Sequence, residues 1–398
     1  MSLTIRNLTP MMQQYLEIKA TVPEHILFYR LGDFYEMFYE DAEIASEALD
    51  LVLTSRNAGG GTKAPLCGIP YHSAQGYIAK LIEKGFTIAI CEQVEDPKLA
   101  KNLVKREVVK IITQGTLVEE DFLKQKENNY LACVCREEGG YSLSYADLST
   151  FLLRSSYYRE EELRELEEEL HLLSAAEVLV EKGIHLELGR QIEKPEIPDT
   201  LLKQFVSVPI EESVKRSLSG LLGYVLETQL MEPETVFDYS FIHREDHMKL
   251  DSTVLAHLEL FETLISKERR GSLLGLLDQA VTPMGSRLLR EWIARPLQSI
   301  SAIETRQDLI ESFFEDPILL SRLQSHLKEI HDLERLLSKL VFSHIMPKDM
   351  RKITSSLAVL PEILAELEGL KEHPLLCDLK PFHTLHKRLE ETLLEDPA

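Results

Sequence analysis

The stretch "LGDFYEMFYED", residues 31–41, places two adjacent aromatic residues and a carboxylate directly after a glycine. It follows "HILFYRL", an apolar run that predicts a buried strand. The apolar spacing from residue 35 to residue 50 predicts a helix. Asp33 and Glu36 have the spacing of a capping box, in which Phe34 would pack on its own helix. The alternative is that Phe34 and Glu36 contact something outside the protein, and the stretch alone leaves both readings open.

The segment up to about residue 116 alternates helical and strand patterns, which indicates an α/β unit. Thr9-Pro10 opens a helix that closes before Pro23, and Gly85 is expected to cap a second helix. "SRNAGGGTKAP" (55–65) is interpreted as a glycine-rich loop. Two further strands are predicted, "FTIAICEQV" (86–94) and "EVVKIITQG" (107–115).

Two further segments of the chain show different patterns of apolar and turn residues. Residues 128–240 begin with two strands joined at Gly139-Gly140, whose turn residues predict a hairpin, followed by an acidic helix and a short strand. Residues 247–398 show helical apolar spacing almost throughout, including "LDSTVLAHLELFETLIS" (250–266). The predicted fold class is therefore a multidomain protein, α/β followed by all-α. Because the chain stops just after an amphipathic pattern, we interpret its last domain as truncated.

Composition indicates a soluble protein without a membrane segment, since no run of 18 apolar residues occurs among the 398. A formal net charge of −22 argues against a nucleic-acid binder when the chain is taken whole. The charge is uneven, however: residues 1–115 hold 12 Lys or Arg and 14 Asp or Glu, a difference of −2. Within them "KLAKNLVKREVVK" (98–110) carries five bases and one acid. We expect a cytoplasmic, nucleoid-associated location.

The sequence lacks the motifs of common catalytic and metal sites. It contains no G-x-x-x-x-G-K-[ST] phosphate loop, no G-x-S-x-G and no H-E-x-x-H. Asp147 ends a predicted strand as a nuclease aspartate would, but metal-dependent hydrolysis needs several carboxylates. The five cysteines are interpreted as free buried thiols, Cys133 and Cys135 included. We therefore expect no catalytic residue, no metal, no cofactor and no enzyme activity in this chain.

Four stretches carry a family resemblance. Together with residues 11–56, "APLCGIPYHSAQGYIAKLIEKGFTIAICEQVEDP" (64–97) resembles the mismatch-recognition domain of the bacterial MutS family of DNA mismatch repair proteins. "YSLSYADLST" (141–150) resembles the start of that family's connector domain, although Phe151 stands where the family usually has glycine. "LLDQAVTPMGSRLLREWIARPL" (276–297) resembles the first half of its helical core, or lever, domain.

The resemblance implies a domain plan. It assigns 1–116 to a mixed-sheet mismatch-recognition domain, 117–127 to a linker, 128–240 to an RNase H-like connector, and 247–398 to the first part of the lever. Members of the family continue into a clamp and into an ATPase domain that binds ATP and magnesium. Those regions have no counterpart in this sequence.

The resemblance also implies a binding site, because the family's Phe-x-Glu motif falls on Phe34 and Glu36. Phe34 would wedge into DNA from the minor groove and stack on a mispaired or unpaired base, and Glu36 would hydrogen-bond that base. Candidate contacts to the DNA backbone are Arg56, Lys63, Tyr71 and His72, and for His72 a packed structural role is favoured.

The implied partners are double-stranded DNA with mismatches or small loops, and a MutL-like protein bound through the connector and core. Family members form homodimers, and we expect this chain to be a monomer or a weak dimer. An alternative is a protein-docking or regulatory module with little DNA binding, favoured by the acidic middle segment and the missing clamp. An RNase H-like nuclease is a third and weaker hypothesis, for want of carboxylates.

Overall fold

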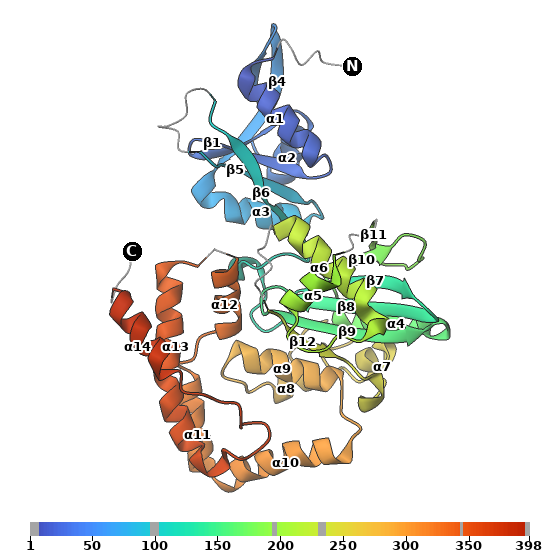
Figure 1. Cartoon of the computed structure of the whole chain (residues 1–398), viewed down its shortest axis with the longest axis vertical. Coiled ribbons are helices and arrows are strands. Elements are labelled where there is room, and N and C mark those ends of the chain that lie inside the picture. Colours follow the sequence, from blue (N-terminus) through green and yellow to red (C-terminus); the bar gives the residue numbers. More distant parts are fainter. Residues whose placement is uncertain (1–7, 96–102, 193–196, 230–235, 343–344, 395–398) are drawn as a thin grey trace. The chain divides into compact units, whose positions relative to one another are not determined.

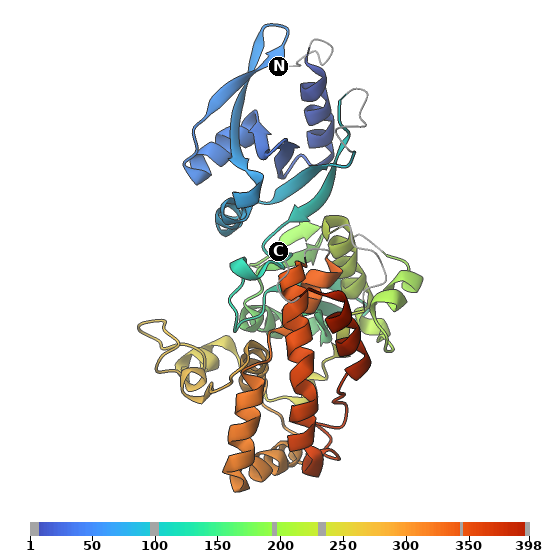
Figure 2. The same ribbon diagram turned by 90° about the vertical axis from the view of Figure 1, so that its left-hand side faces the viewer.

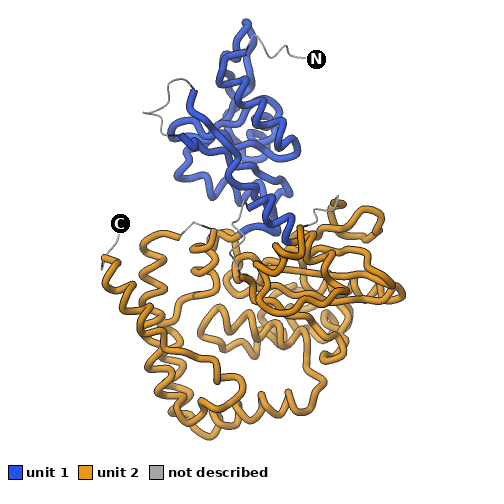
Figure 3. Tube along the Cα trace, in the orientation of Figure 1, with its two compact units in different colours: residues 1–117, 222–232 blue, residues 118–221, 233–398 orange. Residues whose placement is uncertain are grey.

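The computed structural model describes residues 8–95, 103–192, 197–229, 236–342 and 345–394. The chain divides into two compact units, the first formed by 1–117 with 222–232 and the second by 118–221 with 233–398 (Figure 3). Mixed α/β sheets are followed by a helical part, so the predicted fold class is confirmed. The domain boundaries drawn from the sequence remain predictions. In the described part of the chain no helix is both long and apolar enough to cross a bilayer.

Unit 1 is built around a six-stranded sheet of order β3-β4-β2-β1-β5-β6 (Figure 1). Its strands are β1 (Ile26–Leu31), β2 (Phe34–Phe38), β3 (Thr54–Gly59), β4 (Thr62–Pro70), β5 (Ile88–Gln93) and β6 (Arg106–Ile112). Its helices are α1 (Pro10–Thr21), α2 (Glu40–Leu49), the short η2 (Tyr71–Ser73), α3 (Ala74–Glu83) and the end of α6 (Lys215–Gln229). Only the β1–β5 pairing is parallel; the other pairings of this sheet are antiparallel.

The prediction of a helix from residue 35 was wrong, because residues 34–38 form strand β2. β2 pairs with β1 on one side and with β4 on the other, so its backbone groups are satisfied by the sheet. The helix α2 starts only at Glu40, after Tyr39 with a φ of 54°. The capping-box reading of Asp33 and Glu36 is therefore also wrong. Tertiary pairing overrode a helical apolar spacing that was real only from residue 40 onward.

The glycine-rich segment 55–65 is a β-hairpin rather than a loop. β3 and β4 pair in antiparallel fashion around Gly60 and Gly61, whose φ angles of 59° and 80° are both positive. Two positive φ values are what a tight hairpin turn of the favoured hand requires, and glycine adopts them without strain. The run of glycines therefore marked the turn, and the strands on its two sides were missed.

The buried carboxylate of Asp41 ties α1, α2 and β1 together. It accepts hydrogen bonds from the Tyr15 hydroxyl at 2.9 Å and from the Leu27 amide at 3.0 Å. The Lys19 ammonium lies 2.8 Å from its other oxygen. Tyr15 is itself buried in the apolar core on this face of the sheet, which includes Phe38. Burial and the nearby carboxylate of Asp41 both raise the pKa of Tyr15, so its hydroxyl stays a donor.

Unit 2 contains a second six-stranded sheet, of order β11-β10-β7-β8-β9-β12. Its strands are β7 (Tyr130–Glu137), β8 (Gly140–Asp147), β9 (Leu152–Arg159), β10 (Glu177–Glu181), β11 (Arg190–Ile192) and β12 (Asp238–Phe241). β7, β8 and β9 are antiparallel neighbours, and β10 and β11 extend the sheet in parallel from β7. β12 pairs in parallel with β9 at the other edge of the sheet. Its predicted hairpin is confirmed, with a φ of 77° at Gly139.

Helices flank this sheet. They are η3 (Glu120–Phe122), η4 (Glu160–Glu162), α4 (Leu163–Leu173), α5 (Asp199–Phe205), η5 (Glu212–Val214) and the first half of α6. The apolar face of α4, with Leu166 and Leu170, packs in one core with Val134 and Leu143 of the sheet. The acidic run that predicted α4 is thus the solvated face of an amphipathic helix.

Asp147 has a structural role at the end of β8. Its side chain is fully buried and accepts hydrogen bonds from the amide and hydroxyl of Ser149 and from the Asn129 amide. Burial raises the pKa of Asp147, while these donors lower it. Its oxygens therefore hold the turn after β8 together. Among the described residues no group of three or more His, Cys, Asp or Glu side chains could hold a metal ion.

Four of the five cysteines are buried, as predicted, but Cys377 is exposed, so that part of the prediction was wrong. The sulfur atoms of Cys133 and Cys135 lie 3.9 Å apart on β7. A side-chain carbon on Gly220 would lie 2.9 Å from the Cys133 sulfur, so glycine lets α6 approach the strand. Both thiols are packing groups.

Phe151, which replaces the family's usual glycine, has a left-handed backbone with a φ of 56°. A non-glycine residue at such an angle costs of order 1 kcal/mol or more. Its ring stacks on Phe342 at 5.8 Å and meets Phe237 edge-on at 5.5 Å. These aromatic contacts offset the backbone strain.

The rest of unit 2 is helical, as predicted. Its elements are η6 (Arg244–Asp246), α7 (Ser252–His257), α8 (Leu273–Leu277), α9 (Pro283–Ala294), α10 (Ile300–Glu315), α11 (Pro317–Leu327), α12 (Leu333–Val341), α13 (Pro347–Glu366), η7 (Glu368–Leu370) and α14 (His383–Thr392). The helix expected over 250–266 is wrong beyond residue 257, since Glu259 is left-handed with a φ of 49°. Figures 1 and 2 show α13 lying alongside α11, where Leu323 and Ile363 share a core.

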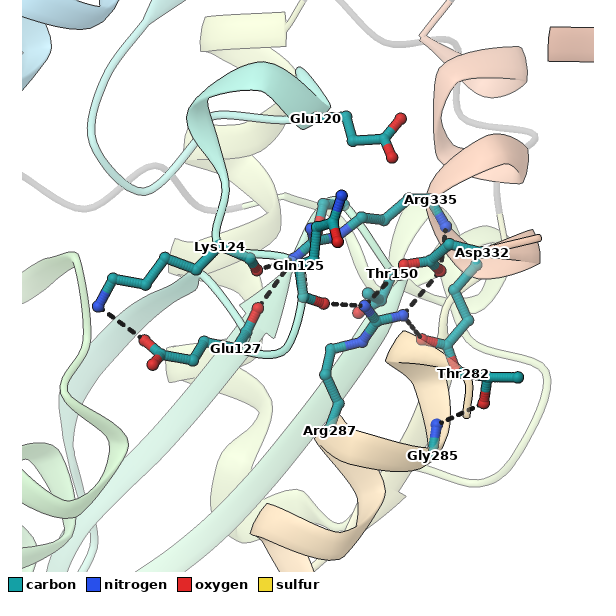
Figure 4. A network of polar contacts seen from close by, with 12 residues as sticks. Glu120, Lys124, Gln125, Glu127, Thr150, Thr282, Gly285, Arg287, Asp332 and Arg335 are labelled. Atoms are coloured by element: carbon teal, nitrogen blue, oxygen red, sulfur yellow. Dashed lines mark hydrogen bonds and ion pairs between the residues drawn. The ribbon is translucent and has the colours of Figure 1, made fainter. Parts of the chain in front are cut away.

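A buried arginine, Arg287 of α9, fastens this helix to α12 and to the segment before β7 (Figure 4). Its guanidinium donates to both carboxylate oxygens of Asp332 at 2.8 Å, to Glu334 at 2.6 Å and to the Gln125 carbonyl at 2.9 Å. Burial works to lower the pKa of Arg287, but the two carboxylates hold it above its ordinary value. Arg287 thus keeps its positive charge inside the unit.

A second arginine, Arg335 of α12, is almost fully buried and donates to the carbonyls of Lys124 and Glu127 at 2.9 and 2.8 Å (Figure 4). From the same helix Lys339 pairs with Glu120 at 3.0 Å, and the Ser338 hydroxyl donates to the Leu148 carbonyl at 2.8 Å. Helix α12 therefore anchors both the stretch that leads into β7 and the turn after β8 by polar contacts.

The contacts of Asp41 predict a local loss of stability in unit 1. Asp41→Asn should cost roughly 2–3 kcal/mol, because hydrogen bonds to a charged group are lost inside the core. Peptide-resolved amide hydrogen exchange should show faster exchange in α1 and β1 and unchanged exchange in α13. The matched control is Asp50→Asn, an exposed left-handed position that asparagine tolerates. Equal exchange in the two variants would contradict the role of Asp41.

The Arg287 network predicts a larger loss in unit 2. Arg287→Met should cost roughly 3–5 kcal/mol, because it leaves Asp332 buried without its cation. Trp292, the single tryptophan, lies on α9 and reports urea unfolding of this region by its fluorescence. Arg290→Met on the same helix is the control, since Arg290 is half-buried over the Phe261 ring and should cost about 1 kcal/mol. Equal urea midpoints for the two variants would contradict the stabilising role given to the Arg287 network.

Candidate nucleic-acid interface

Phe34 is held outside the core at the tip of the β1–β2 hairpin. The two strands are joined by Gly32 and Asp33 alone, with a φ of 58° at Gly32. The Tyr71 amide donates to the Asp33 carbonyl at 2.9 Å, which fixes the tip to η2. Tyr35 and Met37 point to the other side of β2 and are buried, and Phe38, on the same side as Phe34, is buried as well; Phe34, the first residue of the strand, remains 46% exposed. The ring is thus presented by a backbone that is paired on both sides.

Glu36 lies two residues further along β2 and on the same side of the sheet as Phe34. Its partner on the neighbouring strand β4 is Gly68, which has no side chain to cover the Glu36 carboxylate. The Arg56 guanidinium, from β3, donates to the Glu36 carboxylate at 2.9 Å. Burial raises the pKa of Glu36, and the positive charge of Arg56 lowers it. The two predicted site residues Glu36 and Arg56 are therefore brought together as an ion pair.

Tyr71 and His72 follow β4 directly in η2, and both are exposed. The packed structural role expected for His72 is wrong, since its side chain is exposed; its imidazole lies 5.9 Å from the Tyr71 ring in an edge-to-face arrangement. The Arg30 guanidinium lies 3.6 Å from the centre of the Tyr71 ring. Tyr71 is thus half of a cation–π pair beside the hairpin tip.

Lys63 is an exposed lysine of β4, opposite Asn57 and close to the glycine turn. Of the basic run 98–110, residues 98–102 lie outside the described residues. Within the rest, Arg106 is buried and donates to the Arg30 carbonyl, and Lys105 pairs with Glu107. The described part of this run is therefore engaged within the protein.

Sequence reasoning missed Arg30 as a support of the site. Its Nε donates to the Gly32 carbonyl at 2.6 Å, and its guanidinium lies 3.5 Å from Glu92. Glu92 also accepts a hydrogen bond from the Tyr35 hydroxyl, whose pKa is raised by burial and by this contact. The alternation of side chains along the two strands places Arg30 and Tyr35 on one face of the sheet, but no sequence motif marked them as part of the site. Together they stiffen the turn from the side opposite Phe34.

Comparisons with known proteins match both parts of the chain. The sequence model described as MutS domain I matches residues 9–121, and the one described as MutS domain III matches residues 253–398. The two matches together cover well over half of the chain. The first includes every residue of the candidate interface.

Curated relatives carry the name DNA mismatch repair protein MutS. The one from Caldicellulosiruptor saccharolyticus is 41% identical over 391 residues, which are 94% of this chain and 44% of the relative. The Geobacillus thermodenitrificans protein is 40% identical over 98% of this chain and 44% of its own length. A Staphylococcus aureus protein is 39% identical over 98% of this chain and 46% of its own length. The chain spans less than half the length of these relatives, and it belongs to the MutS family of DNA mismatch repair proteins.

Proposed function

We propose that this chain recognises mismatched and looped-out bases in double-stranded DNA, with Phe34 as a wedge and Glu36 as a hydrogen-bonding partner of the displaced base. The observation that carries the proposal is an exposed phenylalanine, held rigidly at a hairpin tip beside a carboxylate, in a MutS domain I. Wedging an apolar ring between base steps costs a few kcal/mol and kinks the duplex. A mispaired base has already lost part of its stacking and pairing, so the wedge enters there at a smaller cost.

This mode of recognition depends on how easily the duplex deforms rather than on a base code. An aromatic ring suits it, because every base offers a face on which to stack, worth roughly 1–3 kcal/mol. Contacts to phosphates from Arg56, Lys63, Tyr71 or His72 would position the wedge without adding sequence preference. All four residues are exposed. Lys63 belongs to β4, which pairs with β2; Arg56 belongs to β3 on the far side of β4, from where its side chain reaches Glu36; Tyr71 and His72 belong to η2, which is bonded to the hairpin tip.

A second candidate function is docking of a protein partner, such as a MutL-like protein. Exposed apolar side chains favour it: Ile310, Phe314 and Ile318 on α10 and α11. If duplexes with a mismatch and without one bind equally, and removal of the Phe34 ring changes nothing, docking replaces DNA recognition as the proposed function.

Removal of the Phe34 ring tests the wedge. Phe34→Ala should weaken binding to a G·T mismatch or a one-base loop by roughly 1–3 kcal/mol, about 5- to 150-fold, because base stacking is lost. Binding to perfect duplex should change little. Fluorescence anisotropy with labelled duplexes at fixed salt measures both affinities. The control is Phe314→Ala, which removes an exposed ring from α10 and should leave both affinities unchanged.

Neutralising Glu36 tests the second element of the site. Glu36→Gln should bind perfect duplex more tightly by roughly 1 kcal/mol, about fivefold, the size of one unit-charge interaction at about 4 Å in water. The ratio of the affinity for mismatched DNA to the affinity for perfect duplex should become smaller as a result. The same anisotropy measurement decides this, and an unchanged perfect-duplex affinity would count against the assignment of Glu36.

A further inference from the structure

The ion pair between Glu36 and Arg56 joins two strands that are not neighbours. β4 lies between β2 and β3, and the pair forms on the face where Gly68 stands opposite Glu36. A side-chain carbon on Gly68 would lie 3.4 Å from Glu36 Cγ, so a larger residue there would crowd the carboxylate. The pair therefore lies on the same side of the sheet as Phe34, beside the proposed DNA contact.

The pair is weak enough to open. The Arg56 side chain is 42% exposed and that of Glu36 is 18% exposed. Ion pairs near the surface stabilise a protein by at most about 1 kcal/mol. A guanidinium bound to a phosphate gains a charge-assisted contact and releases a counterion, so phosphate competes well for Arg56. The competition depends on whether Glu36 has another partner.

We propose that Arg56 is a specificity-determining residue whose contact with a DNA phosphate is conditional on a mismatch, because Glu36 sequesters its guanidinium until a displaced base takes the carboxylate. On perfect duplex no displaced base is available to hydrogen-bond the Glu36 carboxylate. The ion pair between Glu36 and Arg56 therefore stays closed, and Arg56 adds nothing to the affinity for perfect duplex. At a mismatch Glu36 turns to the displaced base, and Arg56 is released to the backbone. This inference rests on the proposed function and adds a regulation of the same site.

The proposal differs from a plain phosphate contact in two measurable ways. A plain contact would raise affinity for all duplexes equally, whereas a conditional contact raises it only for mismatched DNA. Each additional phosphate neutralised changes the slope of log K against log salt by about 0.9. The mismatch complex should therefore show a slope steeper by about one phosphate than the perfect-duplex complex, and Arg56→Met should abolish that difference.

The decisive experiment is a double-mutant cycle on perfect duplex with the full chain. Glu36→Gln frees Arg56, so the gain in affinity of that variant should disappear in the double variant Glu36→Gln/Arg56→Met. Arg56→Met alone leaves the Glu36 carboxylate unpaired, so the readout is the salt slope: it should fall by about 0.9 for the mismatch complex and stay unchanged for the perfect-duplex complex. The matched control, Lys63→Met, removes an exposed charge from the same hairpin and should weaken both complexes by the same factor.

Four outcomes decide the proposal. Loss of the Glu36→Gln gain in the double variant, together with a perfect-duplex salt slope that is steeper by about 0.9 in Glu36→Gln than in the wild type, supports it. A Glu36→Gln gain that leaves the perfect-duplex salt slope unchanged overturns it, because the gain then comes from removal of carboxylate–phosphate repulsion and not from a new phosphate contact of Arg56. An equal fall in the salt slope of both complexes with Arg56→Met, as for Lys63→Met, also overturns it and makes Arg56 a plain phosphate contact. A wild-type chain with no mismatch preference instead overturns the proposed function, and this inference with it.

Discussion

The alternation of side chains along β2 is the constraint on which the candidate site depends. Strands on both sides hydrogen-bond to β2, so its register is fixed by β1 and β4 together. A shift of one residue would carry Tyr35, Met37 and Phe38 out of the cores in which they are buried, because each would turn to the other side of the sheet. The loss of that buried apolar surface prevents the shift and leaves Phe34 at the exposed first position of the strand. The exposure of Phe34 is therefore a consequence of the fold, not a property of a mobile loop.

The same constraint explains why charge and apolar surface coexist in this small area. Glu36 shares one side of the sheet with Phe34, and Gly68 leaves room beside it. Arg56 neutralises the carboxylate in the free protein, so a half-buried acid is tolerated near an exposed ring. On the opposite side of the hairpin, Arg30 and Tyr35 converge on Glu92 and stiffen the turn. A probe that is rigid before it meets DNA loses little conformational entropy on binding.

Much of the fold could be predicted from the sequence, but the site's local geometry could not. Helices α1, α3 and α4 carried clear caps or amphipathic patterns, and Gly139 marked its hairpin. β2 was mistaken for a helix, because its partners lie on strands that local spacing does not reveal. The resemblance to MutS supplied Phe34 and Glu36, whereas the pairing of Glu36 with Arg56 crosses an intervening strand and left no signal in the sequence. The buried arginines of α9 and α12 were likewise invisible, since isolated arginines usually signal solvent exposure.

In the proposed function the Phe34 ring enters the duplex where stacking is already weakened. The most direct measurement places the fluorescent base 2-aminopurine next to a single unpaired base and records its emission on binding, because unstacking relieves its quenching. The account predicts a rise in emission with the wild-type chain and none with Phe34→Ala at saturating protein, and no rise with perfect duplex. An equal rise with Phe34→Ala would contradict the claim, since the base would then be unstacked without the ring.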